Sequence, residues 1–378
     1  MSTQSGSRVP ALTGVRTLAA LAVCLTHAAF WTGHYTEDYV GRLLSRFEIG
    51  VALFFVLSGY LLFAPWVRAL HDARSDRPAA YPPLRRYAWH RVRRIVPAYW
   101  ITVIAVYVIY LFRADTSDFG QGWSGLARNL TFTQVYGVGH LHTGLTQMWS
   151  MTSEVAYYVA LPAVAWLIAA VACRGLWRPD VLLVWLGLLL LISPIWTMLV
   201  HGIDGVDLTA RMWPPAFASW FVGGMILAVL ARLIRRWPAA PSLAVAAVAF
   251  LATGGAVAGE PTIVPNDAGA AVVKHTLYLV VAIALVAPLA IGDGGVWSRL
   301  CGSRPMVWFG EISYEFFLVH VMVLEFVMPL LGYEIFTGST LAAFAVTTVI
   351  SIPVAWVLHR ITAPLWRTSP ALSVGTRG

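Results

Sequence analysis

Charged residues are scarce in this chain: they make up 12% of its 378 residues, against about 25% in an ordinary soluble domain. Cysteine is scarcer, with three residues, an odd number that predicts neither a disulfide framework nor a metal cluster. The Walker loop, the Rossmann fingerprint, the H-E-x-x-H motif and the G-x-S-x-G motif are also missing. The sequence therefore argues against a soluble domain and against the sites that those motifs build.

Apolar residues dominate instead, at 58% of the chain, and the mean hydropathy is +0.71. Such values are typical of an integral membrane protein that crosses the bilayer as helices of about 20 residues. We therefore predict an all-α, polytopic membrane protein with about ten transmembrane helices. Residues 1–378 are expected to form a single membrane domain with no appended soluble domain. The ten spans are expected near residues 14–33, 48–67, 95–112, 149–172, 180–200, 214–233, 241–258, 275–292, 306–331 and 339–359.

The basic residues are distributed unevenly between the loops. The net charge is +8, and all but one of the 26 basic residues are arginine. Most stand just outside apolar spans, which the positive-inside rule explains better than nucleic-acid binding does. We predict an N-in, C-in, multi-pass protein of the plasma (inner) membrane, whose partner is the lipid bilayer and not nucleic acid. Six basic residues then lie outside: Arg42, Arg46, Arg113, Arg128, Arg211 and Lys274.

The first span carries two groups that a membrane helix normally avoids. Arg16 and His27 are eleven residues apart, which places them on one helical face, roughly 16 Å apart along the axis. An arginine that snorkels to the interface and a histidine bonded to a backbone carbonyl would explain them without a function. Ionisable groups inside a span usually face a protein interior or a wet cavity, so a functional role is favoured for His27.

The next two spans supply candidate phosphate-binding groups. Arg91 and Arg94 share a helical face where the third span begins, and guanidinium groups bind phosphates bidentately. Plain positive-inside charge and lipid headgroups are the alternative explanation. In the second span, Ser58 and Gly59 permit close helix packing or a kink, and the serine alternatively faces a channel.

The fourth span places an acid inside the membrane. With its helix starting near Met148, Glu154 and His27 both lie about 9 Å from the outer boundary. A carboxylate and an imidazole at matched depth are the parts of an oriented general base, although Glu154 alternatively pairs with arginine or backbone. The ninth span implies a wet or protein-lined cavity, because ionisable groups are frequent in it. They are Glu311, Glu315, His320 and Glu325.

Two histidines of the long outer loop, His140 and His142, form an H-x-H pair. A metal site needs further ligands, and no Asp, His or Cys at a suitable spacing supplies them. No metal is therefore predicted.

Taken together, these stretches resemble the acyltransferase 3 family of integral membrane acyltransferases. Five family motifs occur in order: R-x10-H, G-V-x-L-F-F-V-L-S-G-x-L, R-x-x-R before P-A-Y-W, W-S-L-x-x-E-x-x-x-Y and I-S-Y-x-x-x-L-x-H. They correspond here to residues 16–27, 50–61, 91–100, 149–158 and 312–320. The chain departs from the pattern at Gln147, Met148, Val155 and Glu315, which leaves the chemistry intact and the acceptor open.

The resemblance implies transfer of an acyl group, usually acetyl, from cytoplasmic acetyl-CoA or another acyl-CoA to a hydroxyl of a carbohydrate-containing acceptor. His27 and Glu154 are the predicted catalytic residues, acting on that hydroxyl toward the outer side. Direct transfer and transfer through an acyl group on His27 are both open, as are the acyl chain length and the oligomeric state. The residues predicted to bind the donor are Arg16, Ser58, Arg91, Arg94 and His320.

Composition bears on the acceptor. A chain rich in Arg and Ala is typical of actinobacteria, where relatives acylate cell-envelope glycolipids such as trehalose mycolates, or macrolide antibiotics. A glycolipid is favoured, with a macrolide or other secondary metabolite as the alternative. A proton-coupled transporter is a further alternative, because buried His and Glu also relay protons, but the motif order disfavours it. A purely structural scaffold does not explain the buried ionisable groups.

Overall fold

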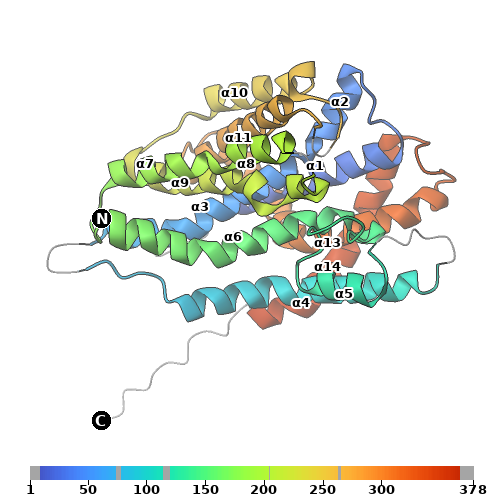
Figure 1. Ribbon diagram of the computed structural model, residues 1–378, viewed down its shortest axis with the longest axis horizontal. Coiled ribbons are helices and arrows are strands. Elements are labelled where there is room, and N and C mark those ends of the chain that lie inside the picture. The colour runs from blue at the N-terminus through green and yellow to red at the C-terminus, as the bar shows by residue number, and fades with distance from the viewer. Residues whose placement is uncertain (1–8, 74–77, 114–119, 204, 263–264, 367–378) are drawn as a thin grey trace, which may run out of the picture.

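The computed structural model describes residues 9–73, 78–113, 120–203, 205–262 and 265–366, and every regular element in these ranges is helical. Most helices run along the long axis of the molecule and pack side by side (Figure 1). The α-helices are α1 (Pro10–Trp31), α2 (Tyr39–Ser45), α3 (Gly50–His71), α4 (Leu84–Tyr110), α5 (Gly122–Leu130), α6 (Trp149–Trp166), α7 (Pro179–Leu190), α8 (Ile192–Gly202), α9 (Ala218–Leu233), α10 (Ala239–Ala252), α11 (Ala268–Ile291), α12 (Val296–Cys301), α13 (Arg304–Leu330) and α14 (Thr340–Trp366). Short 3-10 or π segments are η1 (Arg46–Ile49), η2 (Thr143–Met148), η3 (Leu167–Ala172), η4 (Leu208–Met212), η5 (Pro214–Phe217) and η6 (Ala256–Ala258).

Nine helical segments of the described residues are long and apolar enough to cross a membrane, against about ten predicted. The one that falls short is α10, where the sequence predicts a span at residues 241–258. Its 14 residues form about 21 Å of helix, less than the ~30 Å hydrocarbon core, and it ends just before Gly254 and Gly255. It packs on α11 at the edge of the bundle (Figure 1). The prediction of an all-α, polytopic membrane fold is confirmed.

Both described ends of the chain lie at one end of the bundle. A single cavity there is lined by Val9, which precedes α1, and by Trp366, the last residue of α14. His90 and Gly310, near the starts of α4 and α13, line the same cavity. We call this the arginine-rich end, and its assignment to the cytoplasm stays a prediction. Five arginines predicted to lie inside are outside the described residues: Arg8, Arg74, Arg77, Arg367 and Arg377.

Close contact between α3 and α9 confirms that Gly59 serves helix packing. A Cβ atom on Gly59 would lie 1.9 Å from the Phe221 carbonyl oxygen, and one on Gly224 would lie 2.0 Å from that of Val56. Only glycine permits such an approach of two backbones. Because Ser58 neighbours this contact, the position of its hydroxyl is fixed by the packing of α3 on α9.

Helix α1 is held against α13 in the same way. A Cβ atom on Gly310 would lie 2.1 Å from the Thr13 carbonyl oxygen. The Thr17 hydroxyl donates to the Met306 carbonyl, at 2.7 Å. These contacts bring the polar stripe of the first span next to the ninth, which positions the candidate site.

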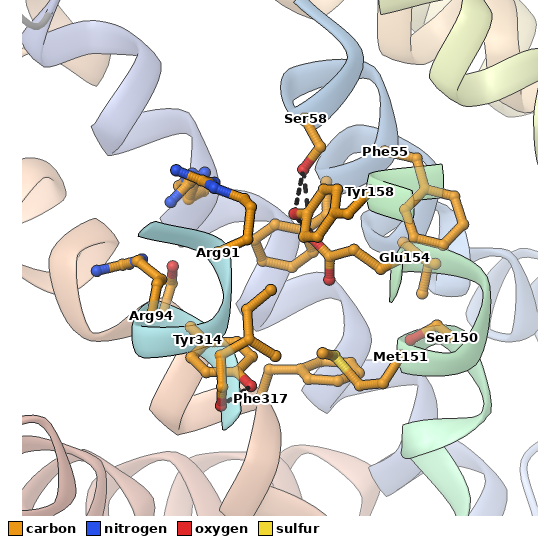
Figure 2. Close-up of a pocket in the computed structure, with 15 residues that line it drawn as sticks. Phe55, Ser58, Arg91, Arg94, Ser150, Met151, Glu154, Tyr158, Tyr314 and Phe317 are labelled. Atoms are coloured by element: carbon orange, nitrogen blue, oxygen red, sulfur yellow. Dashed lines mark hydrogen bonds between the residues drawn. The ribbon is translucent and has the colours of Figure 1, made fainter. Parts of the chain in front are cut away.

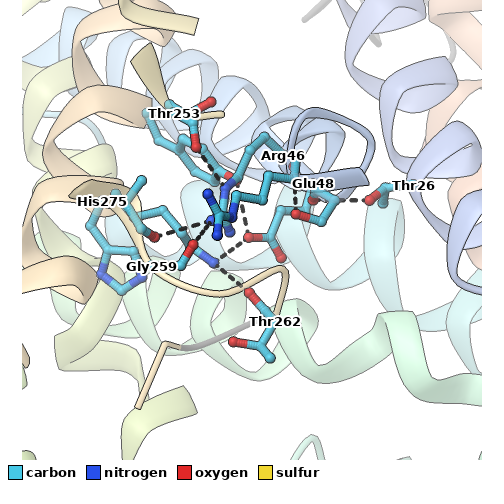
Figure 3. A network of polar contacts seen from close by, with 12 residues as sticks. Thr26, Arg46, Glu48, Thr253, Gly259, Thr262 and His275 are labelled. Atoms are coloured by element: carbon cyan, nitrogen blue, oxygen red, sulfur yellow. Dashed lines mark hydrogen bonds and ion pairs between the residues drawn. The ribbon is translucent and has the colours of Figure 1, made fainter. Parts of the chain in front are cut away.

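A buried charge network fixes the opposite end of the bundle (Figure 3). Arg46 is fully buried, and its guanidinium donates to the carbonyls of Thr253 (3.1 Å) and Gly259 (2.6 Å) beside η6. Lys274 of α11 is also buried and forms an ion pair with Glu48 of η1. Both cations are among the six residues predicted outside, and they tie η1 to η6 and α11.

Candidate active site

A basic cavity of about 740 Å³ opens between α1, α3, α4, α13 and α14 at the arginine-rich end. It contains four of the five residues predicted to bind the donor, from three different helices. They are Arg16 of α1, Ser58 of α3, and Arg91 and Arg94 of α4. The R-x-x-R spacing therefore places both α4 arginines on the face that lines this cavity, and Arg16 of α1 is the third arginine there.

The two α4 arginines are held by aromatic rings and not by acids. The Arg91 guanidinium lies 5.8 Å from the centre of the Tyr158 ring, and that of Arg94 lies 4.1 Å from the Trp366 ring. Among the described residues, no carboxylate lies within 4 Å of either guanidinium. Ring contacts orient a guanidinium and leave its N–H groups available, so this pair is suited to an anionic ligand.

The basic cavity continues into a narrow chamber of about 60 Å³, with Arg16, Ser58, Arg91 and Arg94 lining both (Figure 2). Glu154 of α6 stands in this chamber. Its polar lining comprises Ser58, Ser150, Glu154, Tyr158, Ser313 and Tyr314, and its apolar lining comprises Val51, Phe54, Phe55, Ile95, Met151 and Phe317.

Glu154 is hydrogen-bonded within the chamber. Its Oε1 accepts a hydrogen bond from the Ser58 hydroxyl at 3.3 Å and another from the Tyr158 hydroxyl (Figure 2). Glu154 and Tyr158 are four residues apart on α6, so they share a helical face. The second motif and the fourth motif of the sequence thus meet at a single carboxylate.

A second polar centre lies between α1 and α13. His27 Nδ1 is 2.8 Å from the Val23 carbonyl oxygen and 3.1 Å from Nε2 of His320. His320 Nδ1 is 2.9 Å from the Phe317 carbonyl oxygen. Since a carbonyl only accepts, both rings carry their proton on Nδ1. His27 Nε2 is then the basic nitrogen, and no hydrogen bond engages it among the described residues.

The direct pairing of His27 with Glu154, expected from matched depth, is wrong. No hydrogen bond joins them in the described chain, since Glu154 bonds to Ser58 and Tyr158 while His27 bonds to His320. Helix α6 begins at Trp149, in agreement with the predicted start near Met148. The difference lies in the rotation of α6 about its axis, which directs Glu154 toward Ser58 of α3 and which sequence spacing does not determine.

His320 is also misplaced by the prediction, because it lines neither the basic cavity nor the chamber. Aromatic side chains of the chamber wall adjoin the histidine pair. Phe54 and Phe317 both line the chamber, with ring centres 6.3 Å apart, and the Phe317 ring lies 5.9 Å from that of His320. We call Phe54 and Phe317 the aromatic barrier. Phe54 stands in the second motif, but the motif does not indicate that its ring lines a chamber, and Phe317 and Trp366 are not specified by any of the five motifs.

The other acids of the ninth span have separate environments. Glu311 lines the basic cavity. Glu315 pairs with His359 of α14 at 3.0 Å, and Glu325 accepts from Tyr110 and from Arg113. For the last two, protein side chains rather than a wet cavity accommodate the charge.

The H-x-H pair does not form a metal site in the described residues, where no group of three or more His, Cys, Asp or Glu side chains is placed to hold an ion. His142 is buried against the rings of Tyr107 and Tyr110. Its Nδ1 accepts from the Gly144 N–H, and burial lowers its pKa to about 4. His142 is thus a neutral cap at the start of η2.

The order and placement of these groups can be compared with known proteins. A family model described as an acyltransferase domain, that of the acyltransferase 3 family, matches residues 9–360. The chain belongs to the acyltransferase 3 family. The match covers the basic cavity up to α14, the chamber and the histidine pair.

Two known proteins are similar to this acyltransferase 3 member. It is 28% identical over 341 residues to the acyltransferase MdmB of Streptomyces mycarofaciens, covering 87% of this chain and 82% of that one. It is 24% identical over 344 residues to the peptidoglycan O-acetyltransferase OatA of Listeria monocytogenes, covering 85% of this chain. The chain spans only half of OatA. No solved structure matches. The protein is a multi-pass membrane O-acyltransferase.

Proposed function

We propose that this acyltransferase takes an acetyl group from cytoplasmic acetyl-CoA and transfers it to a hydroxyl of a cell-envelope glycolipid in the plasma (inner) membrane. The main support is the continuity of a cavity lined by three arginines with a narrow chamber that holds Glu154. A donor that carries phosphates at one end and a small thioester at the other is complementary to this space, with its phosphates near the arginines and its thioester in the chamber.

Arg91 and Arg94 would bind the phosphates of coenzyme A. Both lack a carboxylate partner within 4 Å among the described residues, and both face the wide part of the space. Arginine–phosphate pairs are charge-assisted and often bidentate. The pantetheine arm then points to the chamber, where the hydroxyls of Ser58 and Tyr158 surround the thioester and Glu154 orients both.

His27 would act as the general base. Its Nε2 accepts the proton of the acceptor hydroxyl while the hydroxyl oxygen attacks the thioester carbon, and the C–S bond breaks to release the thiolate of coenzyme A. Protonated His27 still donates from Nδ1 to the Val23 carbonyl and to His320. Both acceptors stabilise the imidazolium. His320 would therefore have the role that the sequence predicts for Glu154, that of orienting His27 and stabilising its protonated form. The Phe317 ring, which lines the chamber and lies 5.9 Å from the His320 ring, must move for the thioester to meet Nε2.

The acceptor class is supported by a relative whose name identifies peptidoglycan as its substrate, which is a carbohydrate polymer. A glycolipid presents sugar hydroxyls at the membrane surface, close to the outer part of the bundle where His27 lies four residues from the end of α1. A macrolide or other secondary metabolite is the competing acceptor.

The test is transfer of label. Purified protein in lipid nanodiscs is given radiolabelled acetyl-CoA with envelope glycolipids or with macrolides, and products are separated and counted, with His27→Ala protein as the blank. In parallel, glycolipids from cells with and without the gene are compared by mass spectrometry. Label in a glycolipid, together with loss of one acetyl mass in the deletion strain, is the expected result. Label only in the macrolide would show that the acceptor is a macrolide and not a glycolipid. Proton flux that is independent of acetyl-CoA, without transfer of label, would contradict the proposal.

A further inference from the structure

Large apolar side chains make up much of the chamber wall. Phe54 of α3, Met151 of α6 and Phe317 of α13 all line it. Met151 and Phe317 lie on the side away from the Arg91 guanidinium (Figure 2). Phe54 is half-buried in the first turns of α3. Side chains from three helices thus form a mainly apolar wall, in which Ser150 is the neighbour of Met151.

The volume of the chamber limits what it can hold. About 10–15 Å³ of such space accommodates one water molecule, and a cavity of about 150 Å³ accommodates benzene. A space of about 60 Å³ therefore has room for a handful of non-hydrogen atoms. An acetyl group contributes three and a propionyl group four, whereas a hexanoyl group exceeds the space.

We propose that this chamber receives the acyl group of the donor and selects short chains, with Phe54 and Met151 as the residues that set the length. The inference rests on the proposed function, in that the donor is an acyl-CoA whose thioester lies near Ser58 and Tyr158. Phe54 and Met151 come from different helices, and neither bonds to Glu154 or to the histidine pair. Close-packed walls do not yield easily to added methylenes, so each further carbon meets a steric penalty.

The experiment measures kcat/KM of the purified enzyme for acetyl-, propionyl-, butyryl- and hexanoyl-CoA with a single acceptor. The wild type is expected to lose at least tenfold between propionyl-CoA and hexanoyl-CoA, since one methylene in a tight pocket changes kcat/KM by roughly 10–200-fold. Phe54→Leu and Met151→Ala are each expected to raise the hexanoyl-to-acetyl ratio by about tenfold or more.

Two matched controls come from buried residues that do not line the chamber. Phe63→Leu lies on the same helix as Phe54, and Met225→Ala lies on α9. Both also remove side-chain volume from the core, and both are expected to keep the wild-type ratio. If one chamber variant fails to fold, the other carries the test, because they alter the same wall from different helices.

Equal kcat/KM for acetyl-CoA and hexanoyl-CoA in the wild type would overturn the inference while leaving the proposed function intact. So would an unchanged ratio in the chamber variants, or an equal shift in the controls. Absence of acetyl transfer by the wild type with every acceptor would contradict the proposed function, and the inference with it.

Discussion

His27 is held by two acceptors on one side of its ring, the Val23 carbonyl and His320 Nε2. We expect His27→Ala to abolish transfer, because no other base occupies its position. His320→Ala removes one of the two acceptors that stabilise the imidazolium and should slow turnover by about two orders of magnitude. Turnover at saturating donor is measured on protein whose thermal unfolding matches the wild type.

The double variant separates a joint action of the two histidines from independent ones. His27→Ala with His320→Ala should cost little more than His27→Ala alone, because residues that act as a unit are not additive. Multiplying losses would mean that His320 does not work through His27. Near-normal turnover in a folded His27→Ala protein would remove His27 from the chemistry.

Three arginines of one helical stretch provide a test of donor binding with an internal control. We expect Arg91→Ala and Arg94→Ala to weaken acetyl-CoA binding by roughly 1.5–3 kcal/mol each, the scale of a lost charged hydrogen bond. Arg93→Ala should leave it unchanged, since the Arg93 guanidinium lies 4.4 Å from the Trp89 ring and lines neither the cavity nor the chamber. Isothermal titration of the three variants measures the difference, and equal affinities throughout would refute the phosphate site.

The sequence could place Arg16, Ser58, Arg91 and Arg94 in one space, because helical spacing and the side of the membrane follow from span positions. It could not predict that His320 is the hydrogen-bond partner of His27. The start of α6 at Trp149 agrees with the predicted start near Met148, so depth along this span does not explain the missing contact between Glu154 and His27. Contacts between spans depend on rotation about each axis, which periodicity alone does not determine.

The contact between α3 and α9 leaves no room for a larger side chain at Gly59. Gly59→Ala would place a Cβ atom 1.9 Å from the Phe221 carbonyl oxygen, so the helices must separate. We expect a loss of about 1–3 kcal/mol in the free energy of unfolding, the usual scale of overpacking, together with lower activity through displacement of Ser58. Gly187→Ala on α7 has no atom within 4 Å of the added carbon and should not destabilise the protein. Thermal unfolding in detergent compares the two, and equal midpoints would contradict the close packing.

The positions of the membrane-spanning helices follow most directly from the sequence. Long apolar runs bounded by arginine or by Gly and Pro give span positions directly, and nine of the ten runs became full-length helices in the described chain. The exception, α10, has an apolar run long enough to span, but Gly254 and Gly255 interrupt it after 14 helical residues. Composition alone does not predict that α10 ends early, and it does not show that α11 packs on this helix.

For the molecule as a whole, two exposed positions at opposite ends of α4 provide a test of the predicted orientation in the membrane. Ala80 and Ser124 are exposed, in the loop before α4 and in α5 at the other end of that helix. In intact cells, an impermeant maleimide should label Ser124→Cys and should label Ala80→Cys only after lysis. The native thiols should not interfere, because all three are buried and burial raises the pKa of Cys301 to about 12. The reverse pattern would invert the topology and place the donor cavity outside.

The aromatic barrier has a consequence for the cell's energy supply. Phe317 lines a chamber that is continuous with the basic cavity, and its ring also contacts His320, which is hydrogen-bonded to His27. A continuous wet path through these groups would short-circuit the proton gradient across the membrane, since imidazoles conduct protons. We therefore expect the Phe317 ring to hinder proton flow between the chamber and the histidines between turnovers. Vesicles that contain Phe317→Ala protein should dissipate an imposed pH gradient faster than wild-type vesicles, as followed with a trapped pH-sensitive dye. Equal rates of decay would locate the insulation elsewhere in the bundle.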